Sequence, residues 1–345
     1  MPAASPLNIV QTAQFSRLRH RLHELDSSLK IVPAALLHLE STAPSEGLDH
    51  HVGASVNALQ NPWWNKQGAL RGSRQLISEA RRRLIALLLV DGMAAFENYV
   101  VDLIYAHIAV RPNRPVTAQW TDEKGNKKRP KFSVHQHLVP PFHPKGSRFE
   151  CCANAAKEWS LKVPASARMT AFPSTIKGRG DLSTALPFRI FEYARTARNA
   201  VAHGDSVVSQ ELTQASQHSN LRAEESQLSA RAKDVPELPR FNTGDAVHIE
   251  PEHLVMLFTA LRRSAAEYDK MFLASLRQCE KVEYLMTTFV AYPTTIRKSN
   301  QASRDLTALA RKYLGLKKVT EREIVGCMRS HPQARSIRAL YSLCA

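Results

Sequence analysis

Arg198 and His203 stand five positions apart in a segment (198–203) that reads RNAVAH. Histidine has an ordinary pKa near neutrality, so its imidazole can exchange a proton with an RNA 2'-hydroxyl or a leaving 5'-oxygen. The guanidinium of arginine offers a fixed fork of donors to phosphate oxygens as charge builds up in a transition state. These residue types predict transesterification of an RNA phosphodiester, a reaction that needs no metal ion.

The segment 198–203 closes a predicted amphipathic helix. Pro187 precedes this helix, which we expect to run over residues 188–202, and Gly204 follows it as a helix-ending glycine. Apolar residues recur along the helix at the spacing of a buried face: Ile190, Ala194, Ala197 and Val201. The helix therefore has one side that packs in a core and another that can carry a site.

The helical spacing also separates the two reactive side chains. Arg198 lies about 100° from the buried stripe and can reach a cleft, whereas Asn199 and His203 share the neighbouring polar face. Five residues turn a helix through about 500°, which leaves Arg198 and His203 about 140° apart. Because they cannot converge within one straight helix, we expect a two-fold homodimer in which two such segments share a cleft.

A longer helix is predicted earlier in the chain, from about Ser73 to Val110, with Arg111-Pro112 as its stop. Within it Glu97 has apolar neighbours on its own face: Met93, Val100 and Ile104. Burying an unpaired carboxylate is costly, so Glu97 needs a cationic partner. Arg198 or Arg195 would serve.

The pattern of an arginine, four residues and a histidine, with Asn199 after the arginine and Gly204 after the histidine, resembles the catalytic motif of HEPN domains. It is most similar to the RiboL-PSP-HEPN-like ribonuclease domains of that superfamily, over residues 73–110 and 183–285. The resemblance implies an all-α, HEPN-like helical bundle, often dimeric. Many members are metal-independent endoribonucleases of toxin-antitoxin and antiviral systems.

The resemblance also implies roles for individual residues. His203 would be the general acid and base, Arg198 the group that stabilises the phosphate, and Asn199 an orienting or phosphate-contacting group. Glu97 and Arg195 would support the motif from behind. RNA would be cleaved through a 2',3'-cyclic phosphate, without a cofactor, and an antitoxin or another defence protein would be a partner. The alternative is a non-catalytic HEPN-type module that binds nucleic acid, a nucleotide or a partner protein.

Charge favours a polyanionic partner. The 345 residues include 47 lysines and arginines against 31 aspartates and glutamates, which gives a net charge of +16. A basic, loop-rich insertion at about 111–182, with a short helix near 150–161, separates the two predicted helices. Its exposed cations are the expected nucleic-acid-binding residues: Lys124, Lys127, Lys128, Arg129 and Lys131.

The same insertion contains side chains that could bind zinc: His135, His137, His143, Cys151 and Cys152. Imidazole and thiolate are the usual ligands of zinc, but the spacing matches no structural zinc pattern. Two readings stay open, a zinc site and a surface loop with incidental histidines and cysteines. The second is favoured, and no metal is expected.

Three parts are expected along the chain. Residues 1–70 form an N-terminal helix over 7–39, broken or kinked near Pro33, and then a loop from 41 to 70. Residues 71–288 form the HEPN-like domain, with a mobile polar connector at 205–245 and a long helix from Pro251 to about Leu285. Residues 289–345 form a small basic helical extension.

Neither a membrane span nor a secreted protein is predicted. The most apolar run, at 84–90, is followed by Asp91 and is far shorter than the roughly twenty residues that a span needs. Five cysteines form no regular framework, and no signal-peptide pattern opens the sequence. We therefore expect a cytoplasmic protein that does not bind membranes.

Overall fold

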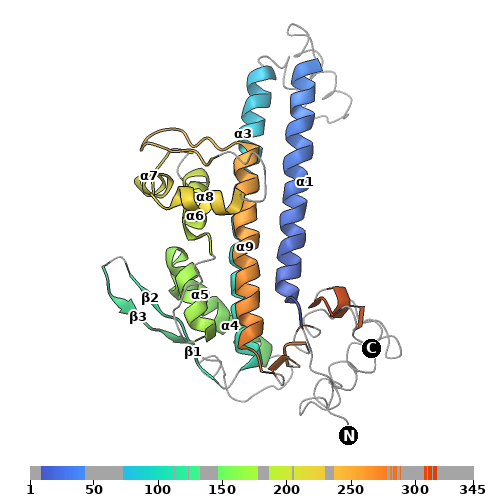
Figure 1. Cartoon of the computed structure of the whole chain (residues 1–345), viewed down its shortest axis with the longest axis vertical. Coiled ribbons are helices and arrows are strands. Elements are labelled where there is room, and N and C mark those ends of the chain that lie inside the picture. Colours follow the sequence, from blue (N-terminus) through green and yellow to red (C-terminus); the bar gives the residue numbers. More distant parts are fainter. Residues whose placement is uncertain are drawn as a thin grey trace. The chain divides into compact units, whose positions relative to one another are not determined.

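Helices form most of the structure, a computed structural model (Figure 1). It describes residues 9–42, 73–111, 114–122, 124–132, 147–177, 186–203, 206–229 and 237–277, with short pieces between 280 and 316. The mainly helical fold predicted from the sequence is confirmed at this level. Residues 43–70 of the loop expected at 41–70 and nearly all of the C-terminal extension lie outside the described residues, whereas 41 and 42 are helical.

Two compact units divide the chain, and the division falls inside the three longest helices, α1 (Ala13–Thr42), α3 (Ser73–Val110) and α9 (Pro251–Ser275). The first unit comprises residues 1–20, 95–188 and 262–345. The second unit comprises residues 21–94 and 189–261. The candidate residues are therefore split, with Glu97 and the basic insertion in the first unit and Arg198 in the second.

Helix α1 begins where Thr12 caps it, because the Thr12 hydroxyl accepts a hydrogen bond from the Phe15 N–H at 3.0 Å. Four leucines then bury one face: Leu18, Leu22, Leu25 and Leu29. Of the break or kink predicted near Pro33, the break is wrong, since the helix continues through this residue to Thr42. Pro33 follows Leu29 by four positions and is itself buried, so packing of its ring offsets the hydrogen bond that proline cannot donate.

Aromatic side chains fill the core of the first unit. The rings of Phe172 and Tyr268 stack with centroids 4.3 Å apart, and the Tyr268 hydroxyl donates to the Met169 carbonyl at 3.0 Å. The Tyr99 hydroxyl of α3 donates to the Ala265 carbonyl of α9 at 2.8 Å. The buried hydroxyls of Tyr99 and Tyr268 thus each have an acceptor, and these bonds join α3 and the helix at 168–177 to α9 within this unit.

The basic insertion is more regular than predicted. The expected short helix is confirmed as α4 (Ser147–Lys162), but the insertion also contains η2 (Ala165–Ala167) and α5 (Arg168–Lys177). Strand β1 (Val116–Thr117) pairs with β4 (Lys131–Phe132), and β2 (Trp120–Thr121) pairs with β3 (Lys127–Lys128), all antiparallel. Helices α5 and α4 pack against β1 and β4, so the hairpin is attached to the unit at its base.

The second unit contains α6 (Phe188–His203), α7 (Gln210–Ser216) and α8 (Leu221–Ser229). The prediction of a helix over 188–202 is confirmed to within one residue. The prediction of a mobile connector at 205–245 is wrong, because α7 and α8 occupy much of it. Its few apolar side chains are buried: Val208, Leu212, Leu221, Leu238 and Phe241.

Helix α9 has an apolar stripe whose members are all buried: Leu254, Leu257, Phe258, Leu261, Tyr268 and Phe272. The predicted end near Leu285 is wrong, since α9 stops at Ser275 and residues 276 and 277 are not helical. The Ser275 carbonyl accepts a hydrogen bond from the Arg111 guanidinium at 2.6 Å. A side chain from 164 positions earlier thus satisfies the last turn of α9.

By length and composition alone, residues 77–110 of α3 would also suit a membrane-spanning helix. Core helices of soluble proteins meet the same test. Helix α3 carries Asp91, Glu97 and Asp102, and much of its apolar surface is buried within the protein. Cytoplasmic localisation stays a prediction.

The buried carboxyl of Asp269 in α9 leads to a pH prediction. It accepts hydrogen bonds from the Thr12 N–H at 3.0 Å and from the Thr12 hydroxyl, which fixes the start of α1. Burial raises the pKa of Asp269 to about 6 from its ordinary 3.8, and the bonds from Thr12 offset part of this effect. The folded protein therefore holds this proton more tightly than the unfolded chain.

This contribution to stability is fully present below pH 3.8 and is lost as the pH rises through about 6. Between about pH 4 and pH 7, we expect wild type to lose up to about 3 kcal/mol of unfolding free energy relative to Asp269→Asn. Urea denaturation followed by circular dichroism across this range measures the difference. Parallel pH profiles for the two proteins would contradict the prediction.

Candidate functional site

Helix α6 carries the candidate motif in its last turns, and a side chain from helix α8 caps its N-terminus. The Glu224 carboxylate accepts hydrogen bonds from the backbone N–H groups of Arg189 at 2.7 Å and Ile190 at 3.0 Å. These donors belong to the first turn, where a helix cannot satisfy them itself. A negative charge at this end also suits the helix dipole. Helix α8 therefore fixes where α6 begins.

The chain that leaves α6 is held as well. The Ser206 N–H donates to the Ala200 carbonyl at 3.2 Å, and the Ser206 carbonyl accepts from the Val247 N–H at 2.7 Å. Ser206 has a φ of 63°, a conformation that non-glycine residues rarely adopt. Val207 then pairs with Ala246 as an isolated antiparallel bridge. Ser206, the first described residue after the motif, is thus held by hydrogen bonds of both its N–H and its carbonyl.

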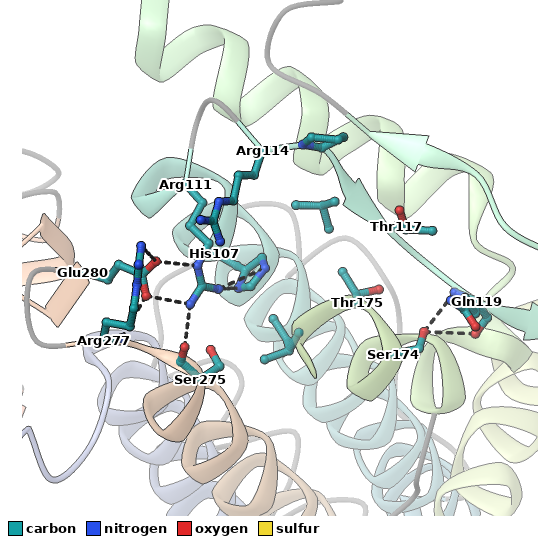
Figure 2. Close-up of a pocket in the computed structure, with 13 residues that line it drawn as sticks. His107, Arg111, Arg114, Thr117, Gln119, Ser174, Thr175, Ser275, Arg277 and Glu280 are labelled. Atoms are coloured by element: carbon teal, nitrogen blue, oxygen red, sulfur yellow. Dashed lines mark hydrogen bonds and ion pairs between the residues drawn. The ribbon is translucent and has the colours of Figure 1, made fainter. Parts of the chain in front are cut away.

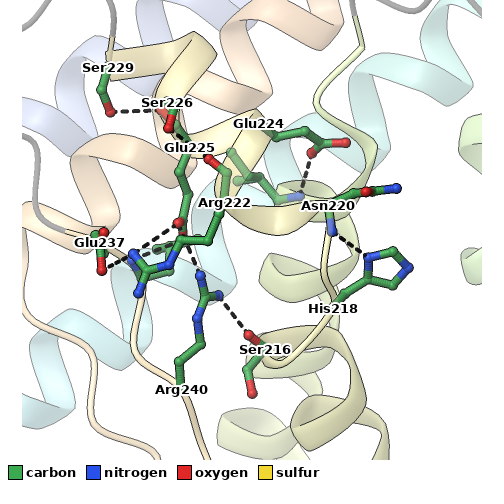
Figure 3. A network of polar contacts seen from close by, with 12 residues as sticks. Ser216, His218, Asn220, Arg222, Glu224, Glu225, Ser226, Ser229, Glu237 and Arg240 are labelled. Atoms are coloured by element: carbon green, nitrogen blue, oxygen red, sulfur yellow. Dashed lines mark hydrogen bonds and ion pairs between the residues drawn. The ribbon is translucent and has the colours of Figure 1, made fainter.

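A buried carboxylate organises the segment that provides these contacts, as Figure 3 shows. The Glu225 side chain is only 4% exposed and pairs with Arg222 at 3.4 Å and Arg240 at 3.1 Å. It also accepts a hydrogen bond from the Leu238 N–H at 3.1 Å, and Arg240 donates to the Ser216 carbonyl at 2.6 Å. Hydrogen bonds and ion pairs of polar residues therefore provide many of the tertiary contacts around α7 and α8.

The candidate side chains on α6 lie where helical geometry predicts. Ile190, Ala194 and Ala197 are buried, and Val201 at the end of this stripe is half-buried. Arg198 and Asn199 are both half-buried, so neither is enclosed in the core. His203 is the last residue of α6, but its side chain lies outside the described residues.

Arg195 has carboxylate partners within its own unit. Its guanidinium donates to Glu192 of the preceding turn at 3.0 Å and lies 3.8 Å from Glu211 of α7. The contact with Glu211 joins α6 to α7. Arg195 therefore supports the motif helix by positioning it, through acidic residues that the sequence analysis did not name.

Glu97 has a cationic partner, as predicted, but this partner comes from the basic insertion. The Arg168 guanidinium at the start of α5 lies 3.7 Å from the Glu97 carboxylate, and both side chains are about one-fifth exposed. Arg168 also donates to the Ser160 carbonyl at 2.7 Å, at the end of α4. Glu97 thus helps to attach the insertion to α3, a role that the sequence analysis missed.

The predicted nucleic-acid-binding cations gather on the hairpin of β2 and β3 and the residues beside it. All five are exposed: Lys124, Lys127, Lys128, Arg129 and Lys131. Asp122 shapes the turn by accepting from the Asn126 N–H at 2.7 Å, and this bond holds the pKa of Asp122 below its ordinary value. It also pairs with Lys128 at 3.3 Å. The other four cations face solvent.

The proposed zinc ligands do not form a described cluster. Cys151 and Cys152 are buried in α4, so the reading that places them in a surface loop is wrong. His135, His137 and His143 lie outside the described residues. Among the residues that the structure does describe, no group of three or more histidine, cysteine or acidic side chains could hold a metal ion.

The described part of the motif thus consists of Arg198 and Asn199, half-buried on a helix that is fixed at both ends, with His203 closing that helix. Arg195 joins α6 to α7 through Glu211, and Glu97 joins α3 to α5 through Arg168. Comparison with protein-family models, with curated proteins and with solved structures finds no match for this chain.

Proposed function

We propose that this protein is a metal-independent endoribonuclease, acting as a toxin or as an antiviral-defence effector. The proposal depends on one observation: Arg198, Asn199 and His203 occupy the last turns of one continuous helix, with the first two only half-buried. The resemblance of this segment to the HEPN motif and the net charge of +16 support it.

The reaction has two proton transfers. The neutral imidazole of His203 accepts the proton of the 2'-hydroxyl as that oxygen attacks phosphorus, and the resulting imidazolium donates a proton to the departing 5'-oxygen. The Arg198 guanidinium binds the phosphate oxygens as their charge increases, and Asn199 orients the same group. The products are a 2',3'-cyclic phosphate and a free 5'-hydroxyl.

Two copies of the chain would complete this site. Because α6 is unbroken from Phe188 to His203, positions 198 and 203 lie about 140° apart around the helix axis of one copy. A two-fold arrangement of two α6 helices would bring the arginine of each copy toward the histidine of the other.

The exposed cations of the hairpin are the proposed docking surface for RNA. Lys124, Lys127, Arg129 and Lys131 face solvent close together in the sequence, and the adjoining Trp120 is half-buried. Such a surface binds phosphates without regard to base sequence and weakens as salt rises. The same exposure favours the second candidate function, a module that binds nucleic acid without cleaving it.

The experiment that separates these functions uses protein purified and assayed in EDTA. End-labelled single-stranded RNA should be cut, and the new 3' ends should resist ligation until a phosphatase that opens cyclic phosphates has acted. RNA that is bound but remains intact would favour the non-catalytic module. Cleavage that appears only after magnesium is added would overturn the proposed mechanism.

A further inference from the structure

A pocket of about 410 Å³ opens in the first unit, where the ends of α3, α5 and α9 meet β1. Figure 2 shows its lining, with arginines toward one end and hydroxyl and amide side chains toward the other. Its volume is within the range typical of small-molecule sites. The pocket contains none of the residues of the candidate catalytic motif.

One end of the pocket carries an excess of positive charge. The Arg111 guanidinium is held by Glu280, with Nε and Nη2 each donating to this carboxylate at 2.9 and 2.8 Å. Arg277 pairs with the same carboxylate at 3.2 Å, and Arg114 is exposed with no partner for its side chain among the described residues. Among the described residues that line the pocket, three guanidinium groups and one carboxylate therefore leave an excess of two positive charges.

The neighbouring histidine does not change this balance. Burial and the adjacent Arg111 guanidinium lower the pKa of His107 to about 3, so its imidazole is neutral at physiological pH. A ring nitrogen of His107 lies 2.9 Å from the Arg111 guanidinium and accepts a hydrogen bond from it. Arg111 is thus fixed in place, whereas Arg277, with a side chain 66% exposed, and Arg114 can reach a ligand.

The other end offers neutral hydrogen-bonding groups. Ser174 is buried, and its hydroxyl accepts from the Gln119 N–H at 2.9 Å, which holds the strand edge in position. The Thr117 hydroxyl and the Gln119 side-chain amide are half-buried and have no partner among the described residues. Between the two ends lies an apolar wall of Val116 and Ile176, both buried.

We propose that this pocket binds a nucleoside monophosphate. The phosphate, a dianion near neutral pH, would lie between Arg114 and Arg277, whose uncompensated charge matches it. The ribose and base would lie against Val116 and Ile176, with Thr117 and Gln119 as hydrogen-bonding partners. A phosphate or a sugar phosphate alone would leave much of the volume empty.

Isothermal titration calorimetry of the full chain tests this with AMP, GMP, CMP and UMP. At least one should bind, and both its unphosphorylated nucleoside and inorganic phosphate should bind at least about tenfold more weakly. Arg114→Ala combined with Arg277→Ala should weaken the nucleotide about tenfold or more, because charged hydrogen bonds are lost. Thr117→Val and Gln119→Ala should weaken the nucleotide while leaving phosphate binding unchanged.

Arg82→Ala is the matched control, since it removes an exposed arginine that does not line the pocket. It should leave binding unchanged, and Arg114→Ala alone keeps the test valid if the double variant fails to fold. Three results would each overturn the proposal: binding of no mononucleotide, equal binding of nucleotide and inorganic phosphate, or binding that Arg114→Ala does not weaken. Binding confined to RNA oligonucleotides would likewise exclude a mononucleotide pocket. None of these outcomes depends on RNA cleavage.

Discussion

Replacement of His203 by alanine is expected to lower the rate of RNA cleavage by about 100- to 10,000-fold, because general acid and base catalysis contributes this much to such reactions. Arg198→Ala should lower it by about 100-fold or more through loss of a donor to the transition-state charge. The rate is measured with end-labelled RNA in EDTA. RNA binding should change far less, since exposed cations elsewhere supply most of the affinity.

Two controls make this result specific. His23→Ala removes an exposed histidine of α1, and it should leave the rate unchanged. Arg198→Lys keeps the positive charge but loses the fork of donors, so it should recover only part of the wild-type rate. Cleavage by His203→Ala at the wild-type rate would remove the imidazole from the mechanism.

The shared cleft has its own signature when the two inactive variants are combined. A dimer of one His203→Ala copy and one Arg198→Ala copy has one cleft with both an intact arginine and an intact histidine. If the two side chains act across copies, co-expression should restore about a quarter of wild-type activity, since half the dimers are mixed and each has one intact cleft. Absence of any recovery would argue against this pairing.

The helices best predicted from the sequence are those with clear boundary residues at their ends and strong apolar periodicity. Pro187 before α6 and Arg111 after α3 mark boundaries that the structure places within about one residue of expectation. The half-burial of Arg198 and Asn199 follows from their angle to the buried stripe alone. Local rules suffice here because local sequence and tertiary packing agree.

Where tertiary contacts determine the local structure, the predictions from the sequence were wrong. The segment 205–245 looks mobile because it is polar, yet the buried carboxylate of Glu225 and a few apolar side chains fix it. The chain passes helically through Pro33 because its ring is buried, and α9 ends at Ser275 because Arg111 reaches its last turn. No periodicity reveals such partners.

The candidate site shows the same limit. The apolar neighbours of Glu97 correctly predict that it has a cationic partner. This partner is Arg168, which could not be identified without knowing how helices α4 and α5 of the insertion are arranged. Glu224 could not be recognised as the cap of α6, because it lies 35 positions from the N–H that it binds. The proposed chemistry follows from residue types, whereas the residues that support the site could be identified only from the structure.

The most buried ion pair among the described residues supports the second large prediction. Glu280 and Arg111 have side chains only 7% and 13% exposed, and Arg111 also donates to the Ser275 carbonyl that ends α9. Replacing Glu280 by alanine would leave a guanidinium buried without its carboxylate. We expect a loss of about 3–5 kcal/mol in unfolding free energy, as when one partner of a buried pair is removed. Urea denaturation followed by circular dichroism measures this loss.

The pH dependence has the sign opposite to that of Asp269. Hydrogen bonds from Arg111 and the Arg277 N–H lower the pKa of Glu280 to about 2 from 4.5, so its contribution to stability is present above pH 4.5 and lost as the pH falls through about 2. Glu280→Gln should flatten the stability profile in that acidic range. An unchanged profile would show that Glu280 is not paired in solution.

A double variant decides whether the loss comes from the unpaired charge rather than from general disruption. Arg111→Met combined with Glu280→Leu removes both charges and keeps apolar volume, so it should be less destabilised than Glu280→Ala, with a coupling of at least about 1 kcal/mol. Losses that simply add would mean that the two side chains act independently. Because Arg111 holds the ends of α3 and α9 together, this coupling also measures how firmly the wall of the proposed nucleotide pocket is fixed.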